Sequence, residues 1–223
     1  MSTDAVDDFH RDVVRTALDV ATRYGFVLGG GVAWVLYGLV KRPTEDVDLF
    51  ADVDGSAGAA VEEIRTALQV AGFDVRDADP DEPDLDLADL FDGFGLDMRE
   101  LFVVRGDRTI KLSLARLDRH DRPVIMDVGP VMSLDDLVGS KVAALVNRRE
   151  PRDYIDTAAA LQRYTVEQVL ALARRQDPGM ELADVIEVGR YIDRLSDARF
   201  ARYGLGPADV AAIRAALAAW PRN

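Results

Sequence analysis

Two acidic residues, Asp46 and Asp48, alternate with apolar residues in a short β-prone segment at residues 45–51. Successive side chains of a strand point to opposite faces, so the two carboxylates share one face while Val47 and Leu49 share the other. Neighbouring carboxylates repel each other and raise each other's pKa. A fold accommodates the two carboxylates most easily with a cation between them. Mg²⁺ or Mn²⁺ suits such a site, because carboxylate oxygens and the oxygens of a substrate phosphate can together form its ligand shell. The pattern predicts a strand with one apolar face and a divalent metal site on the other.

A glycine triplet at residues 29–31 precedes this strand and follows an apolar run at residues 24–28. Glycine lets the backbone approach a ligand closely, and the first N–H groups of a following helix are open to an anion. Gly30 and Gly31 are therefore candidate phosphate-binding residues, although an ordinary strand-to-helix turn also uses glycine. Together with the carboxylates, the triplet describes a site for a metal-bound nucleoside triphosphate.

The composition excludes several other kinds of site. The chain has 223 residues, enough for one domain or one and a half, and 48% of them are hydrophobic. It has no Cys, which excludes disulfides, a thiol nucleophile and a thiolate zinc site. Its two histidines, His10 and His120, show no metal-ligand spacing, and a Ser-His-Asp hydrolase is disfavoured. No apolar run is long enough to cross a membrane, so we expect a cytoplasmic protein without a membrane partner.

The formal net charge of −13 is distributed unevenly. Residues 1–140 contain 14 basic and 29 acidic residues, whereas residues 141–223 contain 13 basic and 11 acidic ones. An acidic protein is repelled by a nucleic-acid backbone at long range, so an RNA partner would need a local basic surface. The arginines between positions 148 and 202 offer one, but ion-paired helix surfaces explain most of them more simply.

Hydrophobic periodicity predicts an α+β (α/β) fold, with a mixed β-sheet in the N-terminal part and helices in the C-terminal part. We place an α/β domain at residues 1–132 and a helical domain at residues 133–223. The expected helices and strands of the first domain are helix 4–23, strand 25–29, helix 31–38, strand 45–51, helix 57–71, strand 73–75, a short helix 85–91 within an acidic loop, a hairpin of 101–104 with 109–114, and strand 123–128. In the second domain we expect helices at 133–147, from Pro151, from Thr165 and at 207–220.

A second group of charged residues lies where the predicted helical domain begins. Lys141 sits in an otherwise apolar helix face, where it can neutralise a phosphate or extend to the surface as an ordinary lysine. Asp153 and Asp156 are three residues apart on the next helix, hence nearly on one face. Acids in a first helical turn also stabilise the helix dipole, an interpretation that suits Asp153 better than Asp156.

The two motifs, in this order, resemble the nucleotidyltransferase superfamily and within it the AbiEii/AbiGii-type toxin family, over roughly residues 20–165. The matching residues are Gly30, Gly31, Arg42, Thr44, Asp46 and Asp48 in the first motif, and Lys141, Arg148 or Arg149, Arg152, Asp153 and Asp156 in the second. The resemblance implies transfer of a nucleoside monophosphate from an NTP to an acceptor hydroxyl, with Mg²⁺ or Mn²⁺ on Asp46 and Asp48. It also implies a tRNA 3′ end as acceptor and a cognate antitoxin as partner.

The remaining roles follow from the same resemblance. Gly30, Gly31, Arg42, Thr44, Lys141 and Arg152 would bind the nucleotide, and Lys141 and Asp156 would join the two metal-binding carboxylates as catalytic residues. Asp156 would orient Lys141 or the acceptor hydroxyl, or act as a general base.

The sequence departs from the superfamily pattern at one position. A third carboxylate is common on a later strand, but the position expected to be acidic is Ser113. Asp127 or Asp118 is a possible substitute. If neither residue replaces the third carboxylate, Asp156 and Lys141 carry out its role in deprotonating the acceptor. Otherwise the protein is a regulator that binds nucleotide without efficient transfer. A small-molecule acceptor is the other alternative.

Overall fold

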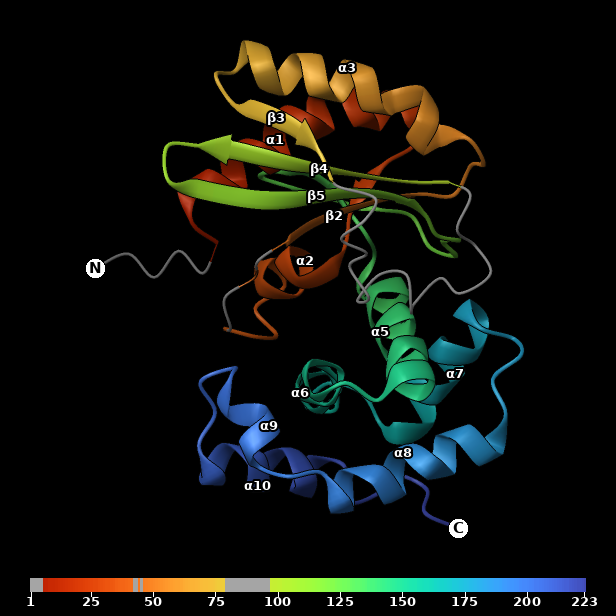
Figure 1. The fold of residues 1–223 in the computed structure, drawn as a ribbon. Helices are drawn as coiled ribbons and strands as arrows, with labels where there is room; N and C mark the ends of the chain where they lie inside the picture. The colour runs from red at the N-terminus through yellow and green to blue at the C-terminus, as the bar shows by residue number, and fades with distance from the viewer. Residues whose placement is uncertain (1–5, 42–43, 45, 79–96) are drawn as a thin grey trace. The chain divides into compact units, whose positions relative to one another are not determined.

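A computed structural model describes residues 6–41, 44, 46–78 and 97–223. The chain forms two compact units, which meet in the sequence between Ser133 and Leu134. The first contains a β-sheet with helices, and the second is helical, as the colour gradient of Figure 1 shows. The predicted α+β class with a mixed sheet is confirmed. The short helix expected at residues 85–91 lies outside the described residues.

The first unit contains both helices and strands. Its helical segments are α1 (Asp8–Ala21), the 3₁₀ turn η1 (Thr22–Tyr24), α2 (Gly30–Leu36) and α3 (Ser56–Val70). Its strands are β1 (Val27–Leu28), β2 (Asp46–Ala51), β3 (Asp74–Asp77), β4 (Met98–Arg105), β5 (Arg108–Arg116), β6 (Val124–Met126) and β7 (Gly129–Val131).

The strands form one mixed sheet in the order β3-β4-β5-β2-β1-β7-β6. Strand β2 runs parallel to β5 and antiparallel to β1, and β4 and β5 form the predicted hairpin. The hairpin strands are longer than expected, because a two-residue turn at Gly106 and Asp107 lets the ladder begin at the Arg105–Arg108 pair. This register sets which side chains share the site.

Residues 123–128, predicted as one strand, belong instead to a hairpin. The chain turns after β6 and returns as β7, with Gly129 at φ +119°, a conformation that favours glycine. Strand β7 pairs in parallel with β1 and thereby extends the sheet.

Helices α1 and α3 cover one face of the sheet, and α2 lies on the other (Figure 1). The covered face is apolar: Val47, Leu49, Leu112 and Leu101 are fully buried. The side chain of Asp7 caps α1 by accepting a hydrogen bond of 3.1 Å from the backbone N–H of His10. The core of the first unit therefore lies on the face of β2 opposite Asp46 and Asp48.

The second unit consists of α5 (Leu134–Arg148), α6 (Pro151–Ala160), α7 (Val166–Gln176), α8 (Leu182–Arg194), α9 (Ala198–Ala201) and α10 (Pro207–Ala216). Helix α7 starts with the capping box predicted at Thr165 and Gln168. Helices α5 and α7 approach closely at Gly139, where a Cβ atom would lie 2.7 Å from the carbonyl oxygen of Leu172. Sequence periodicity did not separate α8 and α9, and α10 ends four residues before the expected Trp220.

Two large buried side chains of the second unit donate hydrogen bonds to the backbone. The Tyr154 hydroxyl donates to the carbonyl of Val188 at 3.0 Å, and the indole N–H of Trp220 donates to Val185 at 2.8 Å. Within the described ranges, no helix combines the length and apolar character needed to span a membrane.

Candidate active site

Asp48 of β2 lies against Gly30 at the start of α2, and Asp46 shares its face of the strand. Both residues are half-buried, whereas Val47 and Leu49 between them are fully buried on the opposite face. This is the alternation predicted from the sequence. The apolar side of the strand anchors it in the core, so the two carboxylates are carried by a rigid element.

The glycine triplet is built around Asp48. The backbone N–H of Gly29 donates to the carbonyl oxygen of Asp48 at 2.8 Å, which ties the turn to β2. Gly30 has φ +56°, and a Cβ atom there would lie 2.5 Å from Asp48 Cγ. At Gly29 a Cβ atom would lie 2.5 Å from the Phe50 ring. Glycine is therefore required at both positions, and the Asp48 carboxylate lies directly against the Gly30 backbone.

Helix α2, which begins at Gly30, has only seven residues. A helix this short offers a weak dipole, so close backbone approach is the stronger reason to expect a phosphate here. Gly31 lies in its first turn, and Thr44, which is half-buried, lies two residues before β2. Arg42 lies outside the described residues.

A third carboxylate, which we did not predict, shares this face of the sheet. Asp48 pairs in register with Ser113 of β5, and Ser113 pairs with Glu100 of β4. The Ser113 hydroxyl donates to Glu100 Oε1 at 3.5 Å, and Lys111 Nζ lies 3.6 Å from the same oxygen. Burial raises the pKa of Glu100, the Ser113 hydrogen bond lowers it, and the negative charge of Asp48 raises it, with a net upward shift.

Glu100 could have been found from the sequence. In a hairpin with a two-residue turn at positions 106 and 107, counting back from the turn pairs residue 100 with residue 113. The predicted strand begins at Leu101, three residues after the observed start of β4 at Met98, and so leaves out Glu100.

The two substitutes that we considered for the third carboxylate are bound elsewhere. Asp127, in the β6–β7 turn, forms salt bridges with Arg11 and Arg15 of α1. Three strands separate β6 from β5, so Asp127 is far from Ser113 in the sheet. Asp118 follows β5, is 59% exposed and pairs with Arg116 at 2.7 Å. Neither side chain joins the row of Asp48 and Ser113.

In the second unit, Lys141 of α5 and the acids of α6 form a compact ion cluster. Lys141 Nζ lies 3.2 Å from Asp153 Oδ1 and 3.2 Å from Asp156 Oδ2. Both acidic residues are fully buried, and the lysine side chain is 13% exposed. The buried ion pairs exclude the alternative that Lys141 is an ordinary surface lysine, while Asp153 lies in the first turn of α6, where an acid also interacts with the helix dipole.

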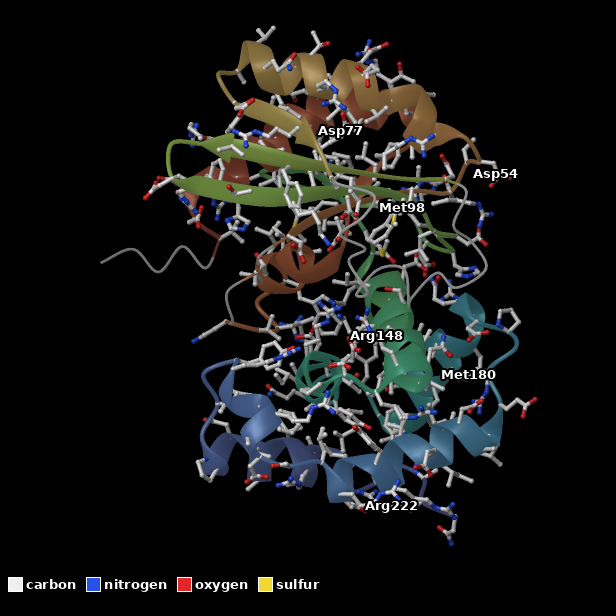
Figure 2. All side chains as sticks on the ribbon, viewed as in Figure 1. Asp54, Asp77, Met98, Arg148, Met180 and Arg222 are labelled. Carbon is white, nitrogen blue, oxygen red and sulfur yellow. The ribbon has the colours of Figure 1, made fainter. Side chains whose placement is uncertain are left out.

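Arg148 completes the cluster from the last turn of α5 and is labelled in Figure 2. Its Nε donates to Asp153 Oδ2 at 2.8 Å and its Nη2 to Asp153 Oδ1 at 3.0 Å, a two-pronged contact. Burial alone would raise the pKa of Asp153, but the positive charges of Lys141, Arg148 and Arg152 outweigh it and hold that pKa below its usual value. Of the two arginines left open by the sequence, Arg148 therefore faces the cluster, while Arg149 lies 3.9 Å from Asp184.

The chemistry of the first-unit site fits a hard divalent cation. Asp46, Asp48 and Glu100 offer only oxygen donors, which suits Mg²⁺ or Mn²⁺. In the described part of the chain, however, no three acidic or histidine side chains come close enough together to hold a metal by themselves. The arrangement fits an ion that takes some of its ligands from a triphosphate and water.

Comparisons with known proteins show the family and the fold of this chain. The family model of the nucleotidyl transferase AbiEii toxin of type IV toxin–antitoxin systems matches residues 11–203. No curated protein matches the chain significantly in sequence. Among solved structures, JHP933 from Helicobacter pylori is similar with a TM-score of 0.56 and 14% identity, covering 93% of this chain and 88% of that one.

MenT4, a nucleotidyltransferase toxin from Mycobacterium tuberculosis, gives a TM-score of 0.57 with 16% identity, covering 93% of this chain and 81% of MenT4. At such identities the solved structures support the fold alone, whereas the family match extends over most of the chain. Nucleotidyltransferases generally use a divalent metal, and the family implies an NTP substrate and an antitoxin partner. The chain belongs to the AbiEii family of nucleotidyltransferase toxins of type IV toxin–antitoxin systems.

Proposed function

We propose that this nucleotidyltransferase uses Mg²⁺ to transfer a nucleoside monophosphate from an NTP to the 3′ hydroxyl of a tRNA in the cytoplasm. The observation that carries the proposal is the Asp48 carboxylate fixed against Gly30, with Asp46 on the same face of the same strand. A bound metal would neutralise charge on the triphosphate and on the reacting phosphorus.

In this reaction the acceptor oxygen bonds to the α-phosphorus, the bond to the β-phosphate oxygen breaks, and pyrophosphate leaves as the hydroxyl proton is released. Asp46 and Asp48 hold the metal, and the backbone of Gly30 and Gly31 binds phosphate oxygens. Catalysis of this type depends on positioning and charge neutralisation more than on covalent chemistry.

The residues of the second motif bind the nucleotide through charge. Lys141 neutralises the triphosphate, and Asp156 orients Lys141, a role that the 3.2 Å contact supports over direct assistance to the acceptor. Arg152, Arg42 and Thr44 complete the proposed nucleotide contacts. We assign residues 1–132 to the nucleotidyltransferase domain and residues 133–223 to the helical domain.

The tRNA acceptor is the least constrained part of the proposal. Several arginines of the second unit lie against acidic side chains: Arg194 pairs with Glu187, and both Arg199 and Arg202 lie near Glu150. These pairs reduce the basic surface available to RNA. A small-molecule acceptor is therefore the alternative that the acidic net charge favours.

The test is incubation with each α-labelled NTP, Mg²⁺ and total tRNA, using wild type, Asp48→Asn and Lys141→Met. The matched control is Arg76→Gln, which removes an exposed arginine paired with Asp74 on β3. We expect labelled tRNA with wild type and the control, and little label with the other two variants.

Other outcomes point elsewhere. Metal-dependent NTP binding that requires Asp48, without labelled tRNA, would indicate a small-molecule acceptor or a regulator. Absence of NTP binding by the folded wild type would exclude the proposed site.

A further inference from the structure

Three adjacent strands carry one row of polar side chains across the sheet. The register joins Asp48 on β2, Ser113 on β5 and Glu100 on β4, and directly opposed residues of paired strands share a face. The next row contains Asp46 and Lys111 in register. Strands β2 and β4, which are far apart in the sequence, thus place Asp48 and Glu100 on either side of Ser113.

Glu100 is enclosed in this row. Its side chain is 15% exposed, and Ser113 beside it is 1% exposed. Burying a carboxylate costs free energy unless charge or hydrogen bonds compensate it. The Ser113 hydroxyl at 3.5 Å and the Lys111 ammonium at 3.6 Å supply part of that compensation.

Carboxylates outnumber ammonium groups among the strand side chains described on this face. Alternation along β2, β4 and β5 places four ionisable side chains of the described residues on it: Asp46, Asp48, Glu100 and Lys111. Three of these four side chains are carboxylates, and the oxygen donors that they offer suit a divalent cation. If Glu100 served only as counterion to Lys111, its place across Ser113 from Asp48 would add repulsion without benefit.

We infer that Glu100 supplies the third negative charge of the metal–triphosphate site, across Ser113 from Asp48. The inference rests on the proposed function and extends it, because it moves the carboxylate expected at Ser113 to the neighbouring strand. Glutamate is one methylene longer than aspartate, and this length carries the carboxylate toward the Ser113 hydroxyl. Glu100 is a positioning residue that strengthens metal binding.

The test is Mn²⁺ binding to the full-length protein, measured by electron paramagnetic resonance with a non-hydrolysable NTP analogue present. Glu100→Gln keeps the shape and removes the charge, and we expect Mn²⁺ affinity to fall about tenfold or more, as for other outer partners of metal sites. The control is Glu63→Gln on α3, an exposed glutamate paired with Arg23, which should bind Mn²⁺ like wild type.

A rescue variant tests the position of the charge. Ser113→Asp in the Glu100→Gln background returns a carboxylate to the row one strand nearer Asp48, and we expect it to recover most of the affinity. Should Glu100→Gln fail to fold, Glu100→Asp retains the charge with a shorter reach, and it should bind Mn²⁺ more weakly than wild type.

The outcomes separate the inference from the proposed function. If Asp48→Asn loses Mn²⁺ affinity while Glu100→Gln binds Mn²⁺ like wild type, Glu100 is only a counterion of Lys111 and the inference is wrong. A change in the melting temperature of Glu100→Gln does not alter this conclusion. If Asp48→Asn itself binds Mn²⁺ like wild type, the proposed metal site is wrong and the inference falls with it.

Discussion

Replacing Lys141 with methionine tests the buried ion cluster most directly. The Lys141 ammonium lies 3.2 Å from a carboxylate oxygen of Asp153 and 3.2 Å from one of Asp156, and both acids are fully buried. Methionine retains much of the apolar stem but removes the positive charge. The substitution therefore leaves two buried carboxylates with less compensation.

The magnitude follows from this geometry. Removing one partner of a buried ion pair typically costs about 3–5 kcal/mol. Here Arg148 still donates two hydrogen bonds to Asp153, and Lys141 is partly exposed, so we expect the lower end, about 3 kcal/mol. In a single transition of a chain of this length 1 kcal/mol corresponds to about 2–4 °C, so the melting temperature should fall by about 6–12 °C. If the second unit unfolds in a transition of its own, about 4–8 °C per kcal/mol gives a fall of about 12–24 °C.

Differential scanning calorimetry of the full chain at neutral pH measures this shift. The two compact units can unfold in separate transitions, so each transition is fitted by itself. Lys41→Met is the matched control, because Lys41 is exposed and its replacement should change stability by no more than about 0.5 kcal/mol. Adding Asp153→Asn and Asp156→Asn to Lys141→Met should restore part of the loss, since the uncompensated charges are gone.

A melting temperature of Lys141→Met equal to that of the Lys41→Met control would refute the reasoning, because the cluster would then contribute nothing to the folded state. The expected destabilisation also affects the activity test. Transfer by Lys141→Met has to be measured well below its melting temperature, so that lost activity reports on the nucleotide and not on unfolding.

Three further predictions follow from the site. Gly30→Ala should lower the free energy of unfolding by about 1–2 kcal/mol, because Gly30 is in a left-handed conformation, and it should also lower Mn²⁺ affinity by displacing Asp48. Gly38→Ala is the control: Gly38 has φ +68° and open space around it, so its replacement should lower stability without changing Mn²⁺ affinity. The folded-state pKa of Asp153 lies below its usual 3.8, so its stabilisation is complete above that value and is lost as pH falls through the folded-state pKa. Acid unfolding followed by circular dichroism should show helical signal lost as pH falls through that pKa, and Asp153→Asn should remove this contribution. Asp127→Asn should change stability by less than about 1 kcal/mol and leave Mn²⁺ binding unchanged, in contrast to Glu100→Gln.

Local pattern predicted the strand that carries the acids and the turn before it. The alternation of Asp46 and Asp48 with Val47 and Leu49 depends only on the two-residue period of a strand, which the sequence displays directly. The helix cap at Thr165 and the proline start at Pro151 depend equally on neighbours in the sequence. Errors occurred where a boundary depended on pairing, as in the hairpin of β6 and β7.

The sequence by itself determined the fold class, the position of the paired carboxylates and the need for glycine beside them, because each follows from local periodicity or backbone freedom. Only the tertiary structure decided which other charges join them. Counting from the hairpin turn pairs Glu100 with Ser113, but Asp48 joins this row only through the pairing of β2 with β5, and Arg148 contacts Asp153 through the packing of α5 against α6. Spacing along the chain does not contain these contacts, since they are fixed by how separate elements pair and bury their apolar faces.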